Sequence, residues 1–262
     1  MPKFTRSLLS LAISGILMSC GSGQPTESIE EDSSEKLDYP SSIEKAHSKA
    51  EFLENESISF DFLLMFRGSV RIDGSMTLAT NSSKGILFKG DDKIMYDGGQ
   101  VFYSPSIEDS SKVRFDAYTW SYFFLFPYKL NDEGTVWKDY PKDSLNNELY
   151  EAQKLTFESG TGDAPDDWYI TYAHPDSKLL HAAAYIVTYS KDKEKAEEDP
   201  HAIVYKDYKE VNGISIAHAW EFYGWRDSRG LTEQLGSATL SNFKFHKNGE
   251  VDYSVPQDFK EI

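Results

Sequence analysis

The stretch Ser57–Ala79, SISFDFLLMFRGSVRIDGSMTLA, decides the fold because its hydrophobic residues recur at every second position. Its first half carries a hydrophobic face made of Ile58, Phe60, Phe62, Leu64 and Phe66, and its second half carries one made of Val70, Ile72, Met76 and Leu78. A period of two is typical of a β-strand that buries one face. Arg67-Gly68-Ser69 lies between the halves and offers a turn. We therefore predict two antiparallel strands, each with a half-buried face.

The rest of the chain repeats this pattern. Hydrophobic segments suited to strands occur at 86–88, 94–96, 101–103, 168–172, 179–189, 202–208, 214–223 and 237–245. Asn212-Gly213 separates two of them, and Asn-Gly is a strong signal for a two-residue hairpin turn. Segment 179–189 is apolar at odd and even positions, which predicts a strand covered on both faces. Residues 191–199, a dense mix of lysine and acid, are predicted to be a solvated loop. In all, we predict about ten antiparallel strands.

Two segments break the strand pattern. Residues 42–54 carry hydrophobic side chains at helical spacing, and Ser41 with Glu44 has the arrangement of a capping box, so we predict a helix. Residues 115–130 form the most aromatic part of the chain, and their hydrophobic residues do not alternate. There we predict a short helix that lies against the sheet and ends at Pro127, because proline interrupts the hydrogen bonding of a helix.

The start of the chain predicts a membrane anchor. Residues 1–19 have a basic beginning and then an apolar stretch too short to span a bilayer, which is typical of a signal peptide. Leu17-Met18-Ser19-Cys20 resembles the bacterial lipobox, in which leucine lies three positions before the cysteine. The resemblance implies cleavage before Cys20 and lipid attached to Cys20, and several acyl chains make a stable anchor. An ordinary secretory signal with an incidental cysteine is the alternative.

Residues 20–38 are rich in small residues and acids, so we predict a flexible tether that cannot bury a core. In many Gram-negative bacteria, an aspartate directly after the lipidated cysteine favours retention in the inner membrane. This chain has Gly21 at that position, which favours the outer membrane. The acids behind Cys20 favour the cell surface in some bacterial groups, whereas a solvated linker explains them more simply. We therefore expect a lipid-anchored protein of the outer membrane that faces the periplasm or the cell surface. Residues 39–262 show no second linker and are predicted to form one domain.

The charge of the chain excludes some partners. The formal net charge is −16, from 27 basic and 43 acidic residues, and removal of the basic signal peptide makes it more negative. So acidic a surface repels phosphate groups, which excludes nucleic acid and argues against adhesion of the folded domain to anionic lipid headgroups. Membrane attachment is thus expected through lipid on Cys20 alone. The chain has 1 cysteine, so an intramolecular disulfide is excluded.

No motif predicts a catalytic residue, a metal site or a cofactor. The 6 histidines do not occur at the close spacing of paired metal ligands. His181 and His218 fall on two predicted strands and would make a zinc or acid–base pair if they met, although packed or solvated histidines are the simpler interpretation. Asp163, Asp166 and Asp167 lack the spacing of a calcium-binding loop and are predicted to lie in a solvated loop.

Two short motifs resemble those of known proteins. Residues 168–172, followed by a turn and by residues 178–180, look like the double strand of LolA- and LolB-like lipoprotein carriers. Residues 205–214, YKDYKEVNGI, resemble the hairpin that comes next in those carriers, and an uncharacterised bacterial lipoprotein family on the same plan is more similar still. The likeness covers roughly residues 42–245 and departs at Ala217, where the carriers usually have proline. It implies a mainly β (α+β) fold with a single strongly curved antiparallel sheet, which forms an incomplete β-barrel with a helical aromatic plug on its concave side.

The aromatic segment is the feature that suggests a function. On this plan the sheet carries Phe60, Phe62, Leu64 and Phe66, and the plug carries Trp120, Phe123, Phe124 and Phe126. These side chains either make an ordinary core or surround a cavity for an apolar ligand such as a lipid acyl chain. One hypothesis is therefore a non-enzymatic, membrane-anchored lipoprotein that binds such a ligand or the acyl chain of another lipoprotein. The other is a structural or protein-interaction lipoprotein of the cell envelope with a packed core and no ligand.

Overall fold

The computed structural model describes residues 37–141 and 144–262. Thirteen strands form one antiparallel sheet in the order β15-β5-β4-β3-β2-β1-β14-β13-β12-β11-β10-β9-β6, and β7 pairs with β8 in a separate hairpin. The predicted signal peptide and Cys20 lie outside the described residues, as does most of the predicted tether.

Short strands lie toward the ends of the sheet and the longest ones near its centre. The strands are β1 (Ser57–Phe66), β2 (Ser69–Ala79), β3 (Lys84–Lys89), β4 (Asp92–Asp97), β5 (Gln100–Tyr103), β6 (Thr135–Asp139), β7 (Ser144–Leu145), β8 (Glu148–Leu149), β9 (Glu151–Phe157), β10 (Tyr169–Ala173), β11 (Leu180–Tyr185), β12 (His201–Val211), β13 (Ile214–Arg226), β14 (Gly230–His246) and β15 (Lys260–Glu261). The helices are α1 (Tyr39–Ala46), α2 (Lys49–Leu53), α3 (Val113–Leu125), the 3-10 turn η1 (Phe126–Tyr128) and α4 (Lys193–Glu197).

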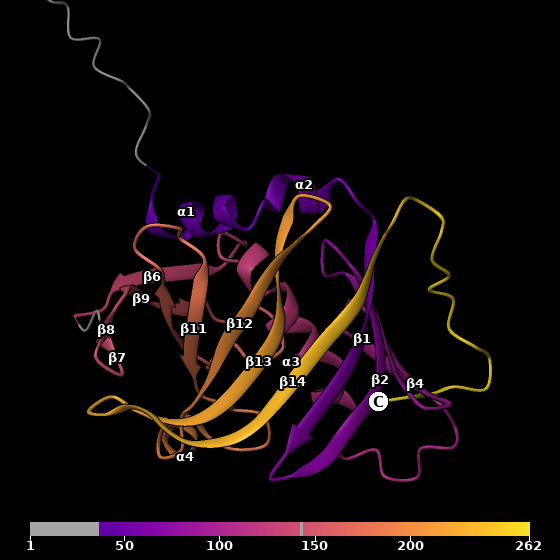
Figure 1. The fold of residues 1–262 in the computed structure, drawn as a ribbon. Coiled ribbons are helices and arrows are strands. Elements are labelled where there is room, and N and C mark those ends of the chain that lie inside the picture. The colour runs from indigo at the N-terminus through magenta and orange to yellow at the C-terminus, as the bar shows by residue number, and fades with distance from the viewer. Residues whose placement is uncertain (1–36, 142–143) are drawn as a thin grey trace, which may run out of the picture. The chain divides into compact units, whose positions relative to one another are not determined.

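The sheet curves strongly around α3, which occupies its concave side (Figure 1). Strands β4 and β6 lie on opposite sides of α3, and α1 and α2 run across one end of the curved sheet (Figure 1). One edge consists of β5 with the short β15, and the other is β6; in the described residues no strand pairing joins the two edges. The fold is thus the predicted half-barrel, with a gap between its edges.

Strand β1 lies between β2 and β14 and has the predicted alternation. Phe60, Phe62 and Leu64 are at most 2% exposed. The prediction was wrong for Val70, which is 58% exposed. The pairing of β1 with β2 shifts register between Leu64 and Met65, and such an irregularity changes which face the following side chains occupy.

Helix α3 confirms the predicted aromatic helix. It ends at Leu125, and η1 with Pro127 continues the chain as a tighter turn. Pro127 supplies no backbone N–H, so the α-helical hydrogen bonding stops just before it.

The N-terminal helix differs from the prediction of one helix over 42–54. Helix α1 begins at Tyr39, and the side chain of Asp38, not Ser41, caps it by accepting from the Ser41 N–H at 2.9 Å. Ser48 adopts a left-handed conformation, with φ of 56°, and separates α1 from α2. Glu44 does not complete a capping box because it accepts a hydrogen bond from the Asn131 N–H at 2.8 Å.

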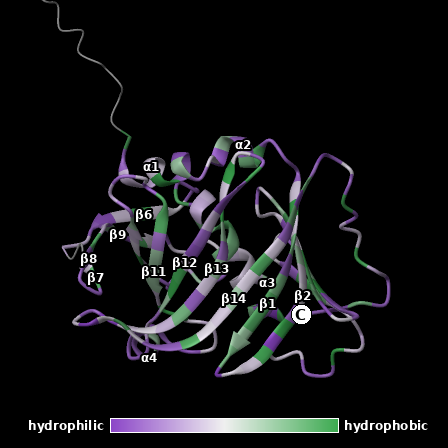
Figure 2. Cartoon of the chain, in the orientation of Figure 1, coloured by the Kyte–Doolittle hydropathy of each residue, from purple (hydrophilic) through white to green (hydrophobic). Residues whose placement is uncertain are grey.

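A second hydrophobic core covers the convex face of the sheet. It joins β10, β11 and β12 to the β7–β8 hairpin and α4, and its buried members are Leu145, Tyr150, Trp168, Ile170, Tyr172, Ala182, Ala184, Ile186, Ala196, Ala202, Val204 and Trp225. Strand β11 is thus covered on both faces, as predicted. The predicted solvated loop at 191–199 instead contains α4, and Ala196 of this helix is fully buried. Figure 2 shows how hydrophobic and hydrophilic residues alternate along the long strands.

The main sheet has thirteen strands rather than about ten, because β6, β9 and β15 were not predicted. Strands β6 and β9 are mostly half-buried along their length, so no clear alternation marks them in the sequence. In the part of the chain that the structure describes, no helix is both long and apolar enough to cross a membrane.

Candidate functional site

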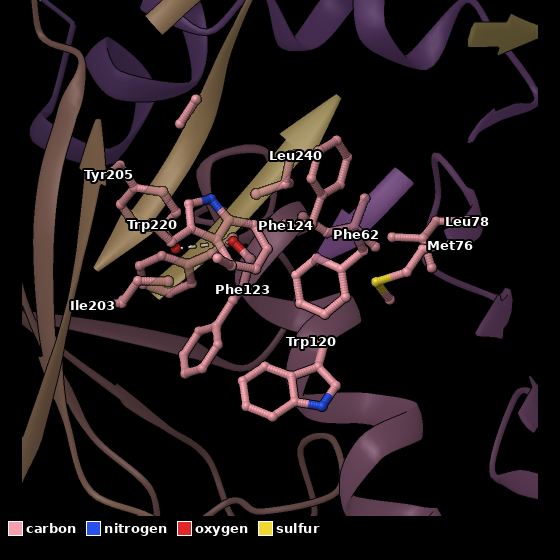
Figure 3. Close-up of a cluster of buried hydrophobic side chains, with 14 of the residues drawn as sticks. Phe62, Met76, Leu78, Trp120, Phe123, Phe124, Ile203, Tyr205, Trp220 and Leu240 are labelled. Atoms are coloured by element: carbon pink, nitrogen blue, oxygen red, sulfur yellow. Dashed lines mark hydrogen bonds between the residues drawn. The ribbon is translucent and has the colours of Figure 1, made fainter. Parts of the chain in front are cut away.

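Helix α3 packs one of its faces tightly against the sheet. The ring of Phe124 stacks on Phe60 with centroids 4.3 Å apart, and Trp120 lies 6.2 Å from Phe62 and 6.2 Å from Phe66. Figure 3 shows Phe62, Trp120 and Phe124 in one cluster with residues from β12, β13 and β14. Aromatic rings at these separations make favourable contacts in addition to the area they bury. This face of α3 therefore belongs to the core.

The eight residues predicted to surround a cavity come together in this core. All except Phe66 are at most 5% exposed, and Phe66 packs against the core at its margin: Phe60, Phe62, Leu64, Phe66, Trp120, Phe123, Phe124 and Phe126. The predicted contact between the strand and the aromatic plug is present. The rings themselves fill the space in which a cavity was expected, because they pack against one another. A ligand-binding role for them stays a prediction, and of the eight only Phe123 also lines the pocket described below.

A buried ion cluster holds the first turns of α3 on the sheet. Asp116 is 3% exposed and accepts from Arg71 at 2.7 Å and from the Trp120 indole N–H at 3.0 Å. Lys89 lies 3.4 Å from its other carboxylate oxygen. A buried carboxylate needs such partners, since a charge without them is costly in a protein interior. At the other end of the helix, Tyr205 donates to the Phe123 carbonyl at 2.9 Å (Figure 3).

The opposite face of α3 borders a pocket of about 570 Å³. The pocket extends from the turn between β4 and β5 to β6, β9, β10 and β11, so it lies in the gap between the two edges of the half-barrel. Among the described residues, nine aromatic side chains line it: Tyr96, Phe115, Tyr118, Tyr122, Phe123, Phe157, Tyr169, Tyr185 and Tyr189. A concave, mainly apolar pocket of this size suits a small apolar ligand.

Charged side chains also line the pocket, among small and polar residues. Arg114 pairs with Asp163, and Lys129 pairs with Asp132. Asp167 accepts from both the backbone N–H and the hydroxyl of Thr188, each at 2.8 Å. Burial raises the pKa of Asp167 to about 6, despite these two hydrogen bonds. The prediction of a solvated acidic loop is therefore wrong for Asp167, whose carboxylate is partly buried beside the pocket.

Little in the sequence predicts this pocket. Tyr118 and Tyr122 belong to the predicted aromatic helix, but periodicity did not separate its pocket face from its core face. Thr135 and Phe157 lie on β6 and β9, which were not predicted as strands. The available signal was the high tyrosine content of the chain, 16 residues, since tyrosine places an apolar ring and a polar hydroxyl together.

The histidines do not form the hypothesised pair. His181 stacks on Tyr150 on the convex face, with centroids 4.5 Å apart, whereas His218 lies edge-on to Phe243 at 4.8 Å. Burial lowers the pKa of His181 to about 4, so it is neutral at neutral pH. Within residues 37–141 and 144–262, no cluster of three or more histidines, cysteines or acids is placed to hold a metal ion.

Comparison with known proteins addresses the fold. No family model matches the chain, and no curated protein matches it either. Among solved structures, a LolA superfamily protein from Nitrosomonas europaea aligns with a TM-score of 0.51 over 78% of this chain and 94% of its own, at 10% identity. An outer membrane lipoprotein-sorting protein domain from Vibrio parahaemolyticus aligns with a TM-score of 0.53 over 82% of this chain and 95% of its own, again at 10% identity.

The chain has a LolA-like fold. At this low identity the likeness concerns the fold, and the chemistry of the site has to be argued from the residues of this chain. In this LolA-like domain the pocket beside α3 is the candidate functional site.

Proposed function

We propose that this chain is a non-enzymatic lipoprotein of the cell envelope that binds a lipid acyl chain or another apolar molecule in the pocket beside α3. The observation that carries the proposal is the aromatic pocket of about 570 Å³ in the gap of the half-barrel. Burial of an apolar chain against such a wall is favourable by about 25 cal/mol for each Å² removed from water. The LolA-like fold supports the proposal, since one structural neighbour is described as an outer membrane lipoprotein-sorting protein domain.

The proposed anchor is lipid on Cys20, followed by the tether over residues 20–38. Together they would hold the domain at the outer membrane, on its periplasmic or its outer side. The negative charge of the chain, −16, supports attachment through a lipid rather than through the surface of the domain. An anchored domain on a flexible tether would meet its ligand close to the membrane.

A structural or protein-interaction lipoprotein without a ligand is the second candidate. The observation in its favour is the packed concave face, where Phe60 and Phe124 stack and Trp120 is 2% exposed. The two candidates differ in what they require of the pocket, because a purely structural protein has no use for an accessible apolar site.

Filling the pocket distinguishes the two candidates. Thr119 lies on α3 and lines the pocket, so Thr119→Trp places a large ring in the binding space. Val70 is 58% exposed and does not line the pocket, so Val70→Trp is a matched control with the same new side chain. Titration with the uncharged apolar dye phenylnaphthylamine should show binding to the unmodified chain and to the control, and at least a roughly tenfold weaker binding to Thr119→Trp. Equal binding by all three proteins, or binding by none, would count against the proposal.

A further inference from the structure

Three tyrosines form a continuous row along the wall of the pocket. Tyr122 of α3 lies 5.6 Å from Tyr169 of β10, and Tyr169 stacks against Tyr185 of β11 at 6.0 Å, measured between ring centroids. Core rings support the row from behind: Phe126 lies 4.9 Å from Tyr169, and Phe123 lies 4.9 Å from Tyr185. The positions of the three rings are therefore set by packing, before any ligand arrives.

The hydroxyls of this row differ from those of other tyrosines of the pocket. Tyr118 donates to the Gly98 carbonyl at 3.0 Å, and Tyr189 lies 3.5 Å from the Ser111 carbonyl. Tyr122, Tyr169 and Tyr185 have no hydrogen-bond partner for their hydroxyls among the described residues, and none of these hydroxyls is sealed from solvent. They are therefore open to the pocket. Burial raises the pKa of all three well above the ordinary range, so each hydroxyl keeps its proton and is available as a donor.

The charge beside this row is negative. Asp167 lines the same pocket as all three tyrosines. Its negative charge adds to the larger effect of burial in raising the pKa of each. Its Oδ1 atom already accepts from Thr188, and Oδ2 has no partner among the described residues. Arg114 and Lys129 of the pocket are each paired with an acid. Of the residues that the structure describes, Asp167 and Glu133 are the remaining acids of its wall, so the net charge of the pocket is negative.

We propose that Tyr122, Tyr169 and Tyr185 bind the uncharged ester group of an acylated lipid, and that Asp167 disfavours a free fatty acid carrying a carboxylate. This inference rests on the proposed function, because it names the ligand class of the same pocket. An ester carbonyl accepts hydrogen bonds from phenol hydroxyls without bringing a charge next to Asp167. The acyl chain attached to the ester would lie against Phe115, Phe123 and Phe157 of the same wall.

The test compares two ligands with the same hydrocarbon chain. Monododecanoylglycerol has an ester and dodecanoate has a carboxylate, so their competition against phenylnaphthylamine isolates the effect of the head group. The full chain, extracted free of bound lipid and held at about pH 8 so that both Asp167 and dodecanoate are ionised, should bind the ester at least about tenfold more tightly.

Removal of the hydroxyls is the second part of the test. The variant with Tyr122→Phe, Tyr169→Phe and Tyr185→Phe should bind the ester on the order of 10- to 100-fold more weakly, since each hydrogen bond contributes about 2- to 12-fold. Binding of the dye should stay unchanged, which shows that the pocket is intact. Tyr128→Phe is the matched control. Tyr128 is also buried, and burial also raises the pKa of its hydroxyl, but Tyr128 does not line the pocket. Asp167→Asn should narrow the preference for the ester by improving the binding of dodecanoate.

Each outcome separates the inference from the proposed function. If dye, ester and carboxylate all fail to bind the unmodified chain, the proposed apolar site is wrong and the inference fails with it. If the dye binds but the ester and the carboxylate bind equally, the proposed function stands and the inference is overturned. Unchanged ester binding in the triple variant would also overturn the inference. If that variant does not fold, the ratio of the affinities of the unmodified chain for the ester and for the carboxylate still tests the inference.

Discussion

Replacing Trp120 by alanine is expected to destabilise the domain by about 3–5 kcal/mol, the range for removing a fully buried large aromatic side chain. Trp120 is 2% exposed, and its ring lies 6.2 Å from Phe62 and 5.9 Å from Phe222. Its indole N–H also donates to the buried Asp116 at 3.0 Å. The loss therefore combines a cavity with one hydrogen bond to a charged group.

Trp120→Phe separates these two contributions. It removes the hydrogen bond, which is typically about 1.5–3 kcal/mol when the partner is charged, and it leaves a much smaller cavity than alanine does because one aromatic ring stays in the core. Asp116 keeps Arg71 and Lys89 as partners, so we expect the lower end of that range. Urea unfolding of both variants, with the slope of the transition checked against the unmodified chain, measures the two losses. A cost below about 1 kcal/mol for Trp120→Ala would refute the assignment of this face of α3 to the core.

Three further predictions concern other parts of the chain. Burial raises the pKa of Asp167 to about 6 in the folded state, above its ordinary value of 3.8, so ionised Asp167 destabilises the folded state. Asp167→Asn should therefore raise the free energy of unfolding by up to about 3 kcal/mol near pH 7. The gain should shrink as the pH falls through about 6 and should vanish below about pH 3, where Asp167 is protonated in both the folded and the unfolded state. Gly213→Val should destabilise the β12–β13 hairpin by about 1–3 kcal/mol through backbone strain alone, because Gly213 has φ of 80° with no atom within 4 Å of an added Cβ; an unchanged melting curve contradicts this. Cys20→Ser should abolish labelling by an alkyne fatty acid, and a variant that still labels would place the anchor elsewhere.

The predictions from sequence were most accurate where large hydrophobic residues recur along one helix or strand. The alternation of β1 and the aromatic run of α3 each bury large side chains, and the structure pairs Phe60 with Phe124 as expected. The Asn212-Gly213 turn was also predictable, because both residues adopt the positive φ that such hairpins require. These signals are local, and each is carried by the residues of one element.

The pocket depends on information that is not local. Tyr169 contacts Tyr185 on the neighbouring strand, and it contacts Tyr122 only because the sheet curves around α3. The sequence placed aromatic residues in the right helix, yet it did not tell which rings would face the sheet and which the gap. The exposure of Val70 likewise follows from a register shift that leaves no mark in the hydrophobic period.

Ligand binding in the pocket beside α3 is tested most directly by native mass spectrometry of the full chain purified from its host, combined with lipid extraction. We expect the unmodified chain to carry one bound apolar molecule, Val70→Trp to retain this molecule, and Thr119→Trp to lose it. Absence of such a molecule from the unmodified chain, or an equal amount of it on Thr119→Trp, would show that the pocket is not a ligand-binding site.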